Sequence, residues 1–368
     1  MEPDPEREAG RFRHPDANSY TPQPAIDSIG AGETPPLGTP RRVGKPARRK
    51  RGGWRRGLRL VVWLCLVLAL AYAAYIATIV VKISTNSFQI GPLAADTAGR
   101  TNVLVLGVGD PGHAGENLSD TMMILSLDGP AHRLAQISIP RDLRVAIPGF
   151  GYNKINAANA FGGVDLAKQT VSDTFNLPIN YYVKTDFSGL KDLVDAVGGV
   201  DVTVKERLVD REYPCDDNQY KVCGLDIEPG IQHMDGTVAL QYARCRKGTC
   251  GNDFGRAARQ QELLALLRPK LMDPHLLLSP VKLNLLADAT EKGIKTDLGL
   301  FQLLELANSW RVDSANKPVN LVLSTGTGGY LRSDPAGSSD LLPIGGNFSA
   351  ISDKIKTIFS SGDITPTL

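Results

Sequence analysis

The pattern of apolar and polar positions divides the chain into a polar N-terminal stretch, one long apolar run and a region of short alternating elements. The apolar run covers 60–81, 22 consecutive residues without a charge. As a helix it would measure roughly 33 Å, enough to cross the hydrocarbon layer of a membrane. A buried helix of a soluble domain normally keeps a polar face, and this run has none. We therefore predict a transmembrane helix at 60–81. A cleaved signal peptide is the nearest alternative, but its apolar region is usually only about 7–15 residues long.

After residue 100 the pattern alternates between short apolar runs and stretches with helical spacing. Continuous apolar runs predict strands at 102–108, 122–128, 133–139, 179–186, 199–204 and 319–325. Helical spacing predicts helices at 165–176, 187–199, 234–246, 253–272, 298–309 and 348–359. Residues 205–230 lack either pattern and are expected to be loop-rich. Because strands and helices alternate, we predict an α/β fold with a mixed central sheet flanked by helices.

Composition separates the N-terminal stretch from the rest of the chain. Nine prolines precede residue 54, and no apolar periodicity is present there. Such a segment cannot bury enough apolar surface to offset the loss of chain entropy, so we expect residues 1–59 to be a disordered tail. The remaining residues suffice for one large or two modest cores.

Charge gives the apolar run an orientation. Ten basic residues lie at 41–59, directly before the run. By the positive-inside rule, the tail is expected in the cytoplasm and everything after the run outside. A basic run could also bind nucleic acid, but next to a predicted span it is better explained by topology and anionic lipid headgroups. We therefore expect a membrane partner and no nucleic acid.

Cysteine usage agrees with an extracytoplasmic location. Cys65 lies in the apolar run, and the other four, Cys215, Cys223, Cys245 and Cys250, form two close pairs in the sequence. We favour the disulfides Cys215–Cys223 and Cys245–Cys250, although four cysteines allow three connectivities. A zinc site is the alternative, but these spacings match the usual zinc patterns poorly.

Three charged clusters lie at the ends of predicted elements, where a rigid scaffold can support functional residues. The first is at 119–121 and contains Asp120, and the second is at 139–142 and contains Arg141. The third and densest contains Arg244, Arg246, Asp253, Arg256, Arg259 and Gln260.

Helical spacing makes the third cluster more informative than its composition. Asp253, Arg256 and Gln260 are separated by three and four residues, which places them on one helical face. The four arginines of the cluster carry planar guanidinium groups that match phosphate oxygens. The alternative is an ordinary solvated face, in which Asp253 and Arg256 form a simple surface pair.

The order of the motifs resembles a known family. The chain reads S-D-T-M-M, S-I-P-R-D-L, K-I-N-A-A-N-A-F-G-G, L-V-D-A-V-G-G-V, D-G-x-x-A-L-Q-Y-A-R-C-R and D-F-G-R-A-A-R-Q-Q. This order and spacing, over 102–274, is similar to the LytR-CpsA-Psr family of bacterial cell-envelope proteins. The resemblance implies a phosphotransferase that moves a glycopolymer from a polyprenyl-pyrophosphate carrier to peptidoglycan. Phosphoryl transfer depends mainly on positioning and on neutralisation of charge, which suits a cluster of arginines.

The resemblance also implies roles for individual residues. Arg141, Arg244, Arg246 and Arg256 would bind the pyrophosphate, with Arg259 and Gln260 in the adjoining helix motif, and Asp120 would help hold Mg²⁺. Arg141, Asp253 and Arg256 are the expected catalytic group. Asp253 would either orient the arginines, which we favour, or act as a base on the acceptor hydroxyl.

One position departs from the family pattern. Members usually carry L-G-x-D after the first strand, whereas this chain reads Leu106-Gly107-Val108-Gly109-Asp110. Either Asp110 supplies the second metal carboxylate with a shift of one residue, or Asp120 holds Mg²⁺ alone with phosphates and water.

These expectations give a tail at 1–59, a membrane span at 60–81, a stalk at 82–100, a catalytic domain at 101–275 and a C-terminal part at 276–368 that completes or extends it. The protein would lie in a bacterial cell membrane as a single-pass protein with its catalytic domain outside. Two alternatives remain: a hydrolase that uses water as the acceptor, and a non-catalytic envelope sensor or regulator.

Overall fold

A computed structural model describes most of the chain after the predicted tail. The described residues are 52–83, 91–97, 99–112, 115–129, 131, 133–215, 220–277, 279–299, 302–303, 305–306 and 318–359. Residues 1–51, part of the predicted stalk and half of the helix predicted at 298–309 lie outside them. The chain divides into two compact units, Met1–Val61 and Val62–Leu368.

The predicted apolar helix is confirmed as a helix. Helix α1 spans Gly52–Ile83, so it begins earlier than the apolar pattern indicates. Within it, Gly57–Tyr75 has a mean hydropathy of 2.1 and is long and apolar enough to cross a membrane.

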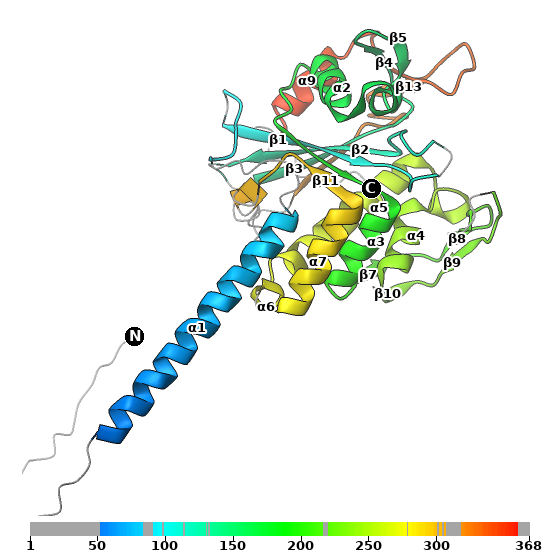
Figure 1. The fold of residues 1–368 in the computed structure, drawn as a ribbon. Coiled ribbons are helices and arrows are strands. Elements are labelled where there is room, and N and C mark those ends of the chain that lie inside the picture. Colours follow the sequence, from blue (N-terminus) through cyan, green and yellow to red (C-terminus); the bar gives the residue numbers. More distant parts are fainter. Residues whose placement is uncertain are drawn as a thin grey trace, which may run out of the picture. The chain divides into compact units, whose positions relative to one another are not determined.

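A six-stranded mixed sheet forms the centre of the second unit (Figure 1). Its strands are β1 (Arg100–Gly107), β2 (Thr121–Asp128), β3 (Arg133–Ile139), β6 (Tyr181–Thr185), β11 (Ile294–Thr296) and β12 (Val319–Val322). Their order is β11-β6-β1-β2-β3-β12. Strands β1, β2 and β3 pair antiparallel, whereas β6 runs parallel to β1 and β12 runs parallel to β3. The predicted mixed α/β class is therefore confirmed.

Side chains alternate between the two faces of the sheet along each strand. Because both faces carry apolar side chains, both are covered by helices. Leu104 and Ile124 point to one core, while Val103 and Met123 point to another. Figure 1 shows α2 (Ala157–Phe175) and α9 (Ser349–Lys356) on one face of the sheet. On the other face lie the helices α3 (Phe187–Ala196), α4 (Gly236–Arg244), α5 (Asp253–Leu271) and α7 (Pro280–Gly293).

The remaining elements are short hairpins and turns outside the central sheet. They are β4 (Arg144–Ile147), β5 (Gly151–Lys154), β7 (Val200–Val204), β8 (Leu208–Asp210), β9 (Leu225–Ile227), β10 (Gly230–Met234), η1 (Gly248–Cys250), α6 (Pro274–Leu277), β13 (Leu331–Ser333) and β14 (Leu341–Pro343). The predicted strand at 199–204 forms β7, which pairs with β10 in a separate two-stranded sheet. The segment 205–230, expected to be loop-rich, contains β8 and β9.

Residues after 275 are part of the same domain. Strands β11 and β12 form the two edges of the central sheet, and Ile351 and Ile355 of α9 lie in its core. This region therefore completes the domain that begins at β1.

The favoured cysteine pairing is confirmed. Cys215 is bonded to Cys223 and Cys245 to Cys250, while Cys65 is free.

Candidate functional site

The antiparallel pairing of β2 with β3 brings the first two charged clusters together. The ladder pairs Met122 with Ile139, and continuing the same register outward places Asp120 opposite Arg141. Nη1 of Arg141 donates to Oδ1 of Asp120 at 2.5 Å. Two clusters that are separate in the sequence thus form one end of the sheet.

Helix α5 brings the third cluster to the same end. Asn252 caps the helix, since its side chain accepts from the backbone N–H groups of Phe254 and Gly255. Further along the helix, Nε2 of Gln260 donates to Oγ1 of Thr121 at 2.8 Å, and Nε2 of Gln261 donates to Oγ of Ser138 at 2.9 Å. These contacts fix the first turns of α5 over the ends of β2 and β3.

Asp253 lies between two of the predicted arginines. Its Oδ2 is 3.8 Å from Nε of Arg141, and its Oδ1 is 3.4 Å from Nη2 of Arg256. The same Nη2 donates to the backbone carbonyl of Asp120 at 3.2 Å. Arg141, Asp253 and Arg256, the predicted catalytic group, are therefore assembled in one place, and the geometry favours the orienting role for Asp253.

These residues line a small surface pocket, which we call the arginine pocket. Its walls include Asp120, Thr121, Arg141, Asp253, Arg256 and Gln260. Nε of Arg141 is buried and has no hydrogen-bond acceptor among the described residues. A buried donor without an acceptor is costly, so the pocket favours a ligand that can accept from it.

The electrostatics of the arginine pocket also favour an anion. Burial lowers the pKa of Arg256, Asp253 offsets this only in part, and the charges of Arg141 and Arg246 lower it further. Arg256 nevertheless stays charged, as arginine does in proteins, and it is only 8% exposed. Burial also lowers the pKa of Arg141, but Asp120, Asp253 and Asp142 together outweigh it and raise the pKa. A buried cation that its neighbours compensate poorly gains from a phosphate oxygen.

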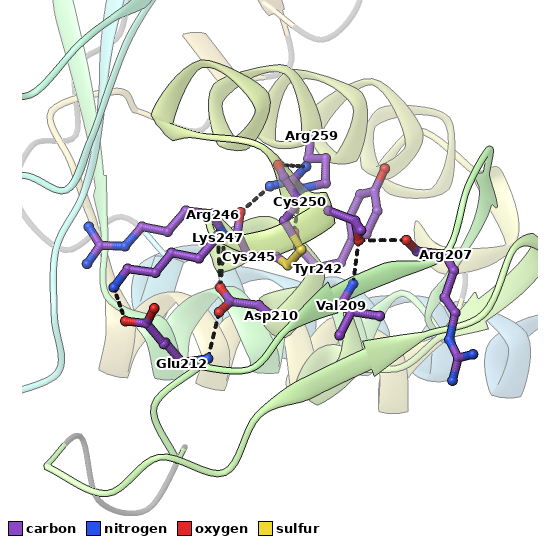
Figure 2. Close-up of a disulfide and its surroundings, with 11 residues drawn as sticks. Arg207, Val209, Asp210, Glu212, Tyr242, Cys245, Arg246, Lys247, Cys250 and Arg259 are labelled. Atoms are coloured by element: carbon purple, nitrogen blue, oxygen red, sulfur yellow. Dashed lines mark hydrogen bonds and ion pairs between the residues drawn. A yellow bond between two sulfur atoms is a disulfide. The ribbon is translucent and has the colours of Figure 1, made fainter.

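Arg244 and Arg246 do not line the arginine pocket, although the charge of Arg246 acts on Arg256. The guanidinium of Arg244 stacks 4.1 Å from the ring centre of Phe187 and 5.5 Å from that of Tyr213. Arg246 follows the bonded Cys245, and Figure 2 shows its side chain extended away from the disulfide.

Arg259 contacts the backbone of the disulfide turn between α4 and α5. Its guanidinium is buried and donates to the backbone carbonyls of Tyr242, Cys245 and Cys250, as Figure 2 shows. Two of these carbonyls close the C-terminus of α4, where helical carbonyls lack partners within the helix. The binding of pyrophosphate by Arg259 stays a prediction, and in this structure the donors of Arg259 hold the disulfide turn.

Asp110 is bonded to the start of α3 and not to Asp120. Oδ1 of Asp110 accepts from the backbone N–H and the hydroxyl of Ser188, at the start of α3, and Asp110 does not line the arginine pocket. Within the described residues no group of three His, Cys, Asp or Glu side chains forms a metal site. Asp120 keeps a partly exposed carboxylate that could serve Mg²⁺ together with phosphate oxygens.

The family of the chain follows from comparison with known proteins. The model of the LytR_cpsA_psr family matches residues 76–332, more than half of the chain. The chain belongs to this family.

Similar members carry informative names. The chain is 33% identical over 211 residues to a Bacillus anthracis protein named polyisoprenyl-teichoic acid–peptidoglycan teichoic acid transferase TagU, covering 57% of this chain and 64% of that protein. The chain thus spans less than two thirds of this relative's length. B. subtilis TagV superposes with a TM-score of 0.56 at 29% identity, covering 74% of this chain and all of TagV. A structure of TagT bound to LI-WTA gives a TM-score of 0.55 at 26% identity, covering 76% and 96% of the two chains.

Sequence reasoning missed two residues that support the site in this family member. Nζ of Lys154 lies 2.6 Å from Oδ1 of Asp142, the neighbour of Arg141, so it fixes that corner of the site. Lys154 opens the K-I-N-A-A-N motif, which could have drawn attention to it. Asp210 is 2% exposed and accepts from the backbone N–H groups of Arg246 and Lys247. It lies in the segment expected to be loop-rich, where no pattern marks it.

Proposed function

We propose that the protein is a membrane-anchored phosphotransferase that moves a glycopolymer from a polyprenyl-pyrophosphate carrier to peptidoglycan. The observation that carries this proposal is the arginine pocket, in which Asp253 lies between Arg141 and Arg256, and Nε of Arg141 has no hydrogen-bond acceptor within the described part of the chain. Such a pocket suits a pyrophosphate. The names of the relatives, which are transferases acting between teichoic acid and peptidoglycan, support the substrate class.

In the proposed reaction, a hydroxyl oxygen of peptidoglycan bonds to the phosphorus that carries the glycopolymer. The bond from that phosphorus to the bridging oxygen breaks, polyprenyl phosphate leaves, the proton of the hydroxyl passes to water or to the leaving phosphate, and a phosphodiester remains. Arg141 and Arg256 bind the phosphate oxygens and neutralise charge that develops on them. Asp253 keeps the two guanidinium groups in place, and Gln260 fixes the helix that carries Arg256.

We propose Mg²⁺ as the cofactor, held by Asp120 and by oxygens of the bound pyrophosphate. When bound, the ion neutralises phosphate charge. The chain would then need the substrate to complete the coordination of the metal, because Asp110 is engaged with Ser188. Chelation of Mg²⁺ is expected to lower the rate, and Asp120→Asn is expected to raise the concentration of Mg²⁺ that half-maximal activity requires.

The anchor in this proposal is α1. Its apolar segment Gly57–Tyr75 follows a basic run, which favours a cytoplasmic N-terminus and an extracytoplasmic site. A polyprenyl carrier lies in the same bilayer, so an anchored site meets its substrate at the membrane surface.

The test uses the full chain in detergent micelles with a lipid-linked pyrophosphoryl glycan and Mg²⁺. Release of polyprenyl phosphate and transfer of labelled glycan are measured with and without peptidoglycan fragments. We expect transfer only with the fragments, and a loss of about a hundredfold or more in Arg141→Ala and in Arg256→Ala. Arg207→Ala, which removes an exposed ion pair with Asp226, is the control and should keep full activity.

Three other outcomes would contradict the proposal. Cleavage that does not depend on peptidoglycan would indicate a hydrolase. Binding of the donor without cleavage would indicate a sensor. Transfer that survives both arginine substitutions would move the reaction away from the arginine pocket.

A further inference from the structure

A second pocket, of about 510 Å³, opens at the end of the sheet where β1 and β6 finish. Its walls include Val108, Asn117, Lys184, Asp186, Lys292 and Lys295, and it shares no lining residue with the arginine pocket. We call it the lysine pocket. None of the motifs that identify the family includes its three lysines, so neither the sequence patterns nor the proposed reaction assigns it a role.

Two of these lysines face each other across a strand pair. β11 pairs antiparallel with β6, and the register places Lys295 directly opposite Lys184. Directly opposite residues share a face of the sheet with Cβ atoms about 5 Å apart, and like charges in this arrangement destabilise the pair. Lys292, in the last turn of α7, adds a third positive charge.

Within the described residues no carboxylate neutralises these charges by an ion pair. None of the three ammonium groups takes part in a salt bridge or a hydrogen bond there. Two carboxylates line the pocket, but both serve backbone groups: Asp186 accepts from Gly189 at 2.8 Å and Glu116 accepts from Gly112. The ammonium groups therefore remain available for a ligand.

Burial adds to the cost of this arrangement. It lowers the pKa of Lys184, Lys295 lowers it further, and Asp186 opposes the shift. Lys292 and Lys295 are exposed, so water hydrates their ammonium groups when no ligand is bound. An anion between Lys184 and Lys295 would relieve the repulsion between them.

The lysine pocket lies near the arginine pocket, at the same end of the central sheet. Gly107, at the end of β1, pairs with Thr121, which lines the arginine pocket, and the next residue, Val108, lines the lysine pocket. β11 is three strands from β2 in the sheet order, which corresponds to roughly 14 Å at the usual strand spacing. A substrate whose pyrophosphate lies in the arginine pocket must extend over this distance, by more than one sugar unit, to reach the lysine pocket.

We propose that Lys184, Lys292 and Lys295 form a second anion-binding subsite that holds a phosphate or carboxylate group of a substrate. The assignment to a substrate rests on the proposed function, whereas the binding of an anion does not. The anion can belong to the glycopolymer donor or to the peptidoglycan acceptor, and the two sources are separated by kinetics.

The binding test uses inorganic phosphate with the full chain in detergent micelles. The lysines are reductively methylated with a ¹³C label, and NMR follows their methyl signals during the titration. Signals lost in Lys184→Gln and Lys295→Gln identify the two residues. We expect these signals to shift on addition of phosphate in the wild type and in Arg256→Ala, and the double variant Lys184→Gln/Lys295→Gln to weaken this binding by about tenfold or more.

Lys205→Gln is the matched control, because Lys205 is exposed and lies outside both pockets. It should leave phosphate binding and activity unchanged. Absence of phosphate-induced shifts at Lys184 and Lys295, or equal binding by the double variant, would overturn the anion site. Because Arg256→Ala is included, that failure would be distinct from a failure of the arginine pocket.

The kinetic test measures KM for each substrate in the double variant. A raised KM for the donor assigns the anion to the glycopolymer, and a raised KM for the peptidoglycan fragment assigns it to the acceptor. Unchanged values for both would overturn the role in substrate binding, even if inorganic phosphate binds.

Discussion

Arg256 and Arg259 lie three residues apart on α5, and both are buried, but their surroundings differ. Arg256 faces the arginine pocket with one poorly aligned carboxylate partner and two repelling arginines nearby. Arg259 has three carbonyl acceptors. The guanidinium of Arg256 can therefore gain from a ligand, whereas the donors of Arg259 are already bonded to backbone carbonyls.

Arg256→Met should remove activity without unfolding the protein. The substitution deletes a charge that burial and repulsion disfavour, and the remaining carboxylates can still pair with Arg141. We expect the free energy of unfolding to change by no more than about 1 kcal/mol, while glycan transfer falls about a hundredfold or more. Thermal denaturation and the transfer assay measure the two effects. A large drop in the melting temperature would indicate that Arg256 is structural.

Arg259→Met is the matched substitution with the opposite expectation. Three buried carbonyls would lose their donor, at a cost of about 1–3 kcal/mol for each group left unsatisfied. We expect a loss of about 3 kcal/mol or more, which lowers the melting temperature by roughly 6 °C or more for a domain of this size. Unchanged thermal stability would contradict the role assigned to Arg259.

The sequence could not separate these two arginines. Both follow Asp253 within two turns of an amphipathic helix, and both are consistent with the spacing of a phosphate site. Their difference arises from α4 and the Cys245–Cys250 turn, which approach α5 only in the folded chain. Asp120, Arg141 and Arg256, in contrast, lie at element ends or on a helical face, so local pattern marks them as candidates, and the family resemblance selects them.

At the scale of elements, the turn between α4 and α5 is held from three directions. The disulfide closes it, Arg259 binds its carbonyls, and Asp210 accepts from the backbone N–H groups of Arg246 and Lys247 (Figure 2). Arg244 and Arg246 flank the bonded Cys245, so the turn controls where these two guanidinium groups lie.

The two disulfides should therefore stabilise the protein by similar amounts, but only Cys245–Cys250 should affect donor binding. Each closes a short loop, and the chain-entropy model gives about 2 kcal/mol for either bond. We expect Cys245→Ala/Cys250→Ala to weaken donor binding as well as stability, and Cys215→Ala/Cys223→Ala to reduce stability alone. Donor KM and thermal denaturation of both double variants test this. Equal donor KM values would exclude a positioning role for the turn.

The surroundings of Asp186, at the start of α3, lead us to expect that the stability of the protein depends on pH. Its side chain caps the helix by accepting from Gly189, yet burial, and then the charge of Asp110, raise its pKa above the ordinary value of 3.8. A raised pKa means that ionisation costs stability, fully above the raised pKa and progressively less as the pH falls toward the ordinary pKa, below which the cost is absent. Asp186→Asn keeps a capping oxygen and removes the charge.

We therefore expect Asp186→Asn to be more stable than the wild type at pH 7, with the difference shrinking as the pH falls through the raised pKa. Thermal denaturation at pH 7 and below pH 4 measures the change. Asp186→Ala, which also loses the cap, should be less stable than Asp186→Asn by about 1 kcal/mol at both pH values. A difference between wild type and Asp186→Asn that grows at low pH would contradict this argument.

At the scale of the whole molecule, the sequence predicted elements better than their pairing. The apolar runs that form β1, β2 and β3 are long and continuous, and they pair with their neighbours in the chain. The strand at 199–204 has the same character but pairs with β10 outside the central sheet. Only three residues form β11, and pairing with β6 stabilises it, so no local pattern could reveal it.

The same limit explains why the lysine pocket was not predicted. Lys184 and Lys295 are far apart in the sequence, and each is an ordinary polar position in its own strand. They become a pair only through the register of β6 with β11.

The apolar helix α1 leads to a prediction that concerns the protein as a whole. If α1 anchors the chain in the bilayer that contains the carrier, it raises the local concentration of the arginine pocket around the pyrophosphate. A protease site inserted between Ile83 and Gly91 would release the rest of the chain on cleavage. We expect cleavage to lower transfer from a long-chain donor in vesicles by about tenfold or more, because the released enzyme must find the surface by diffusion.

A water-soluble donor with a short prenyl chain is the control for this experiment. The rate with this donor should not change on cleavage, because the arginine pocket and its supporting elements all lie after β1 begins. Attaching the cleaved enzyme to nickel-bearing lipids through an N-terminal His tag next to the cleavage site should restore the rate with vesicles. If cleavage slows both donors equally, the helix supports the fold of the site and tethering does not explain its effect. If it slows neither, the carrier reaches the site without help from the anchor.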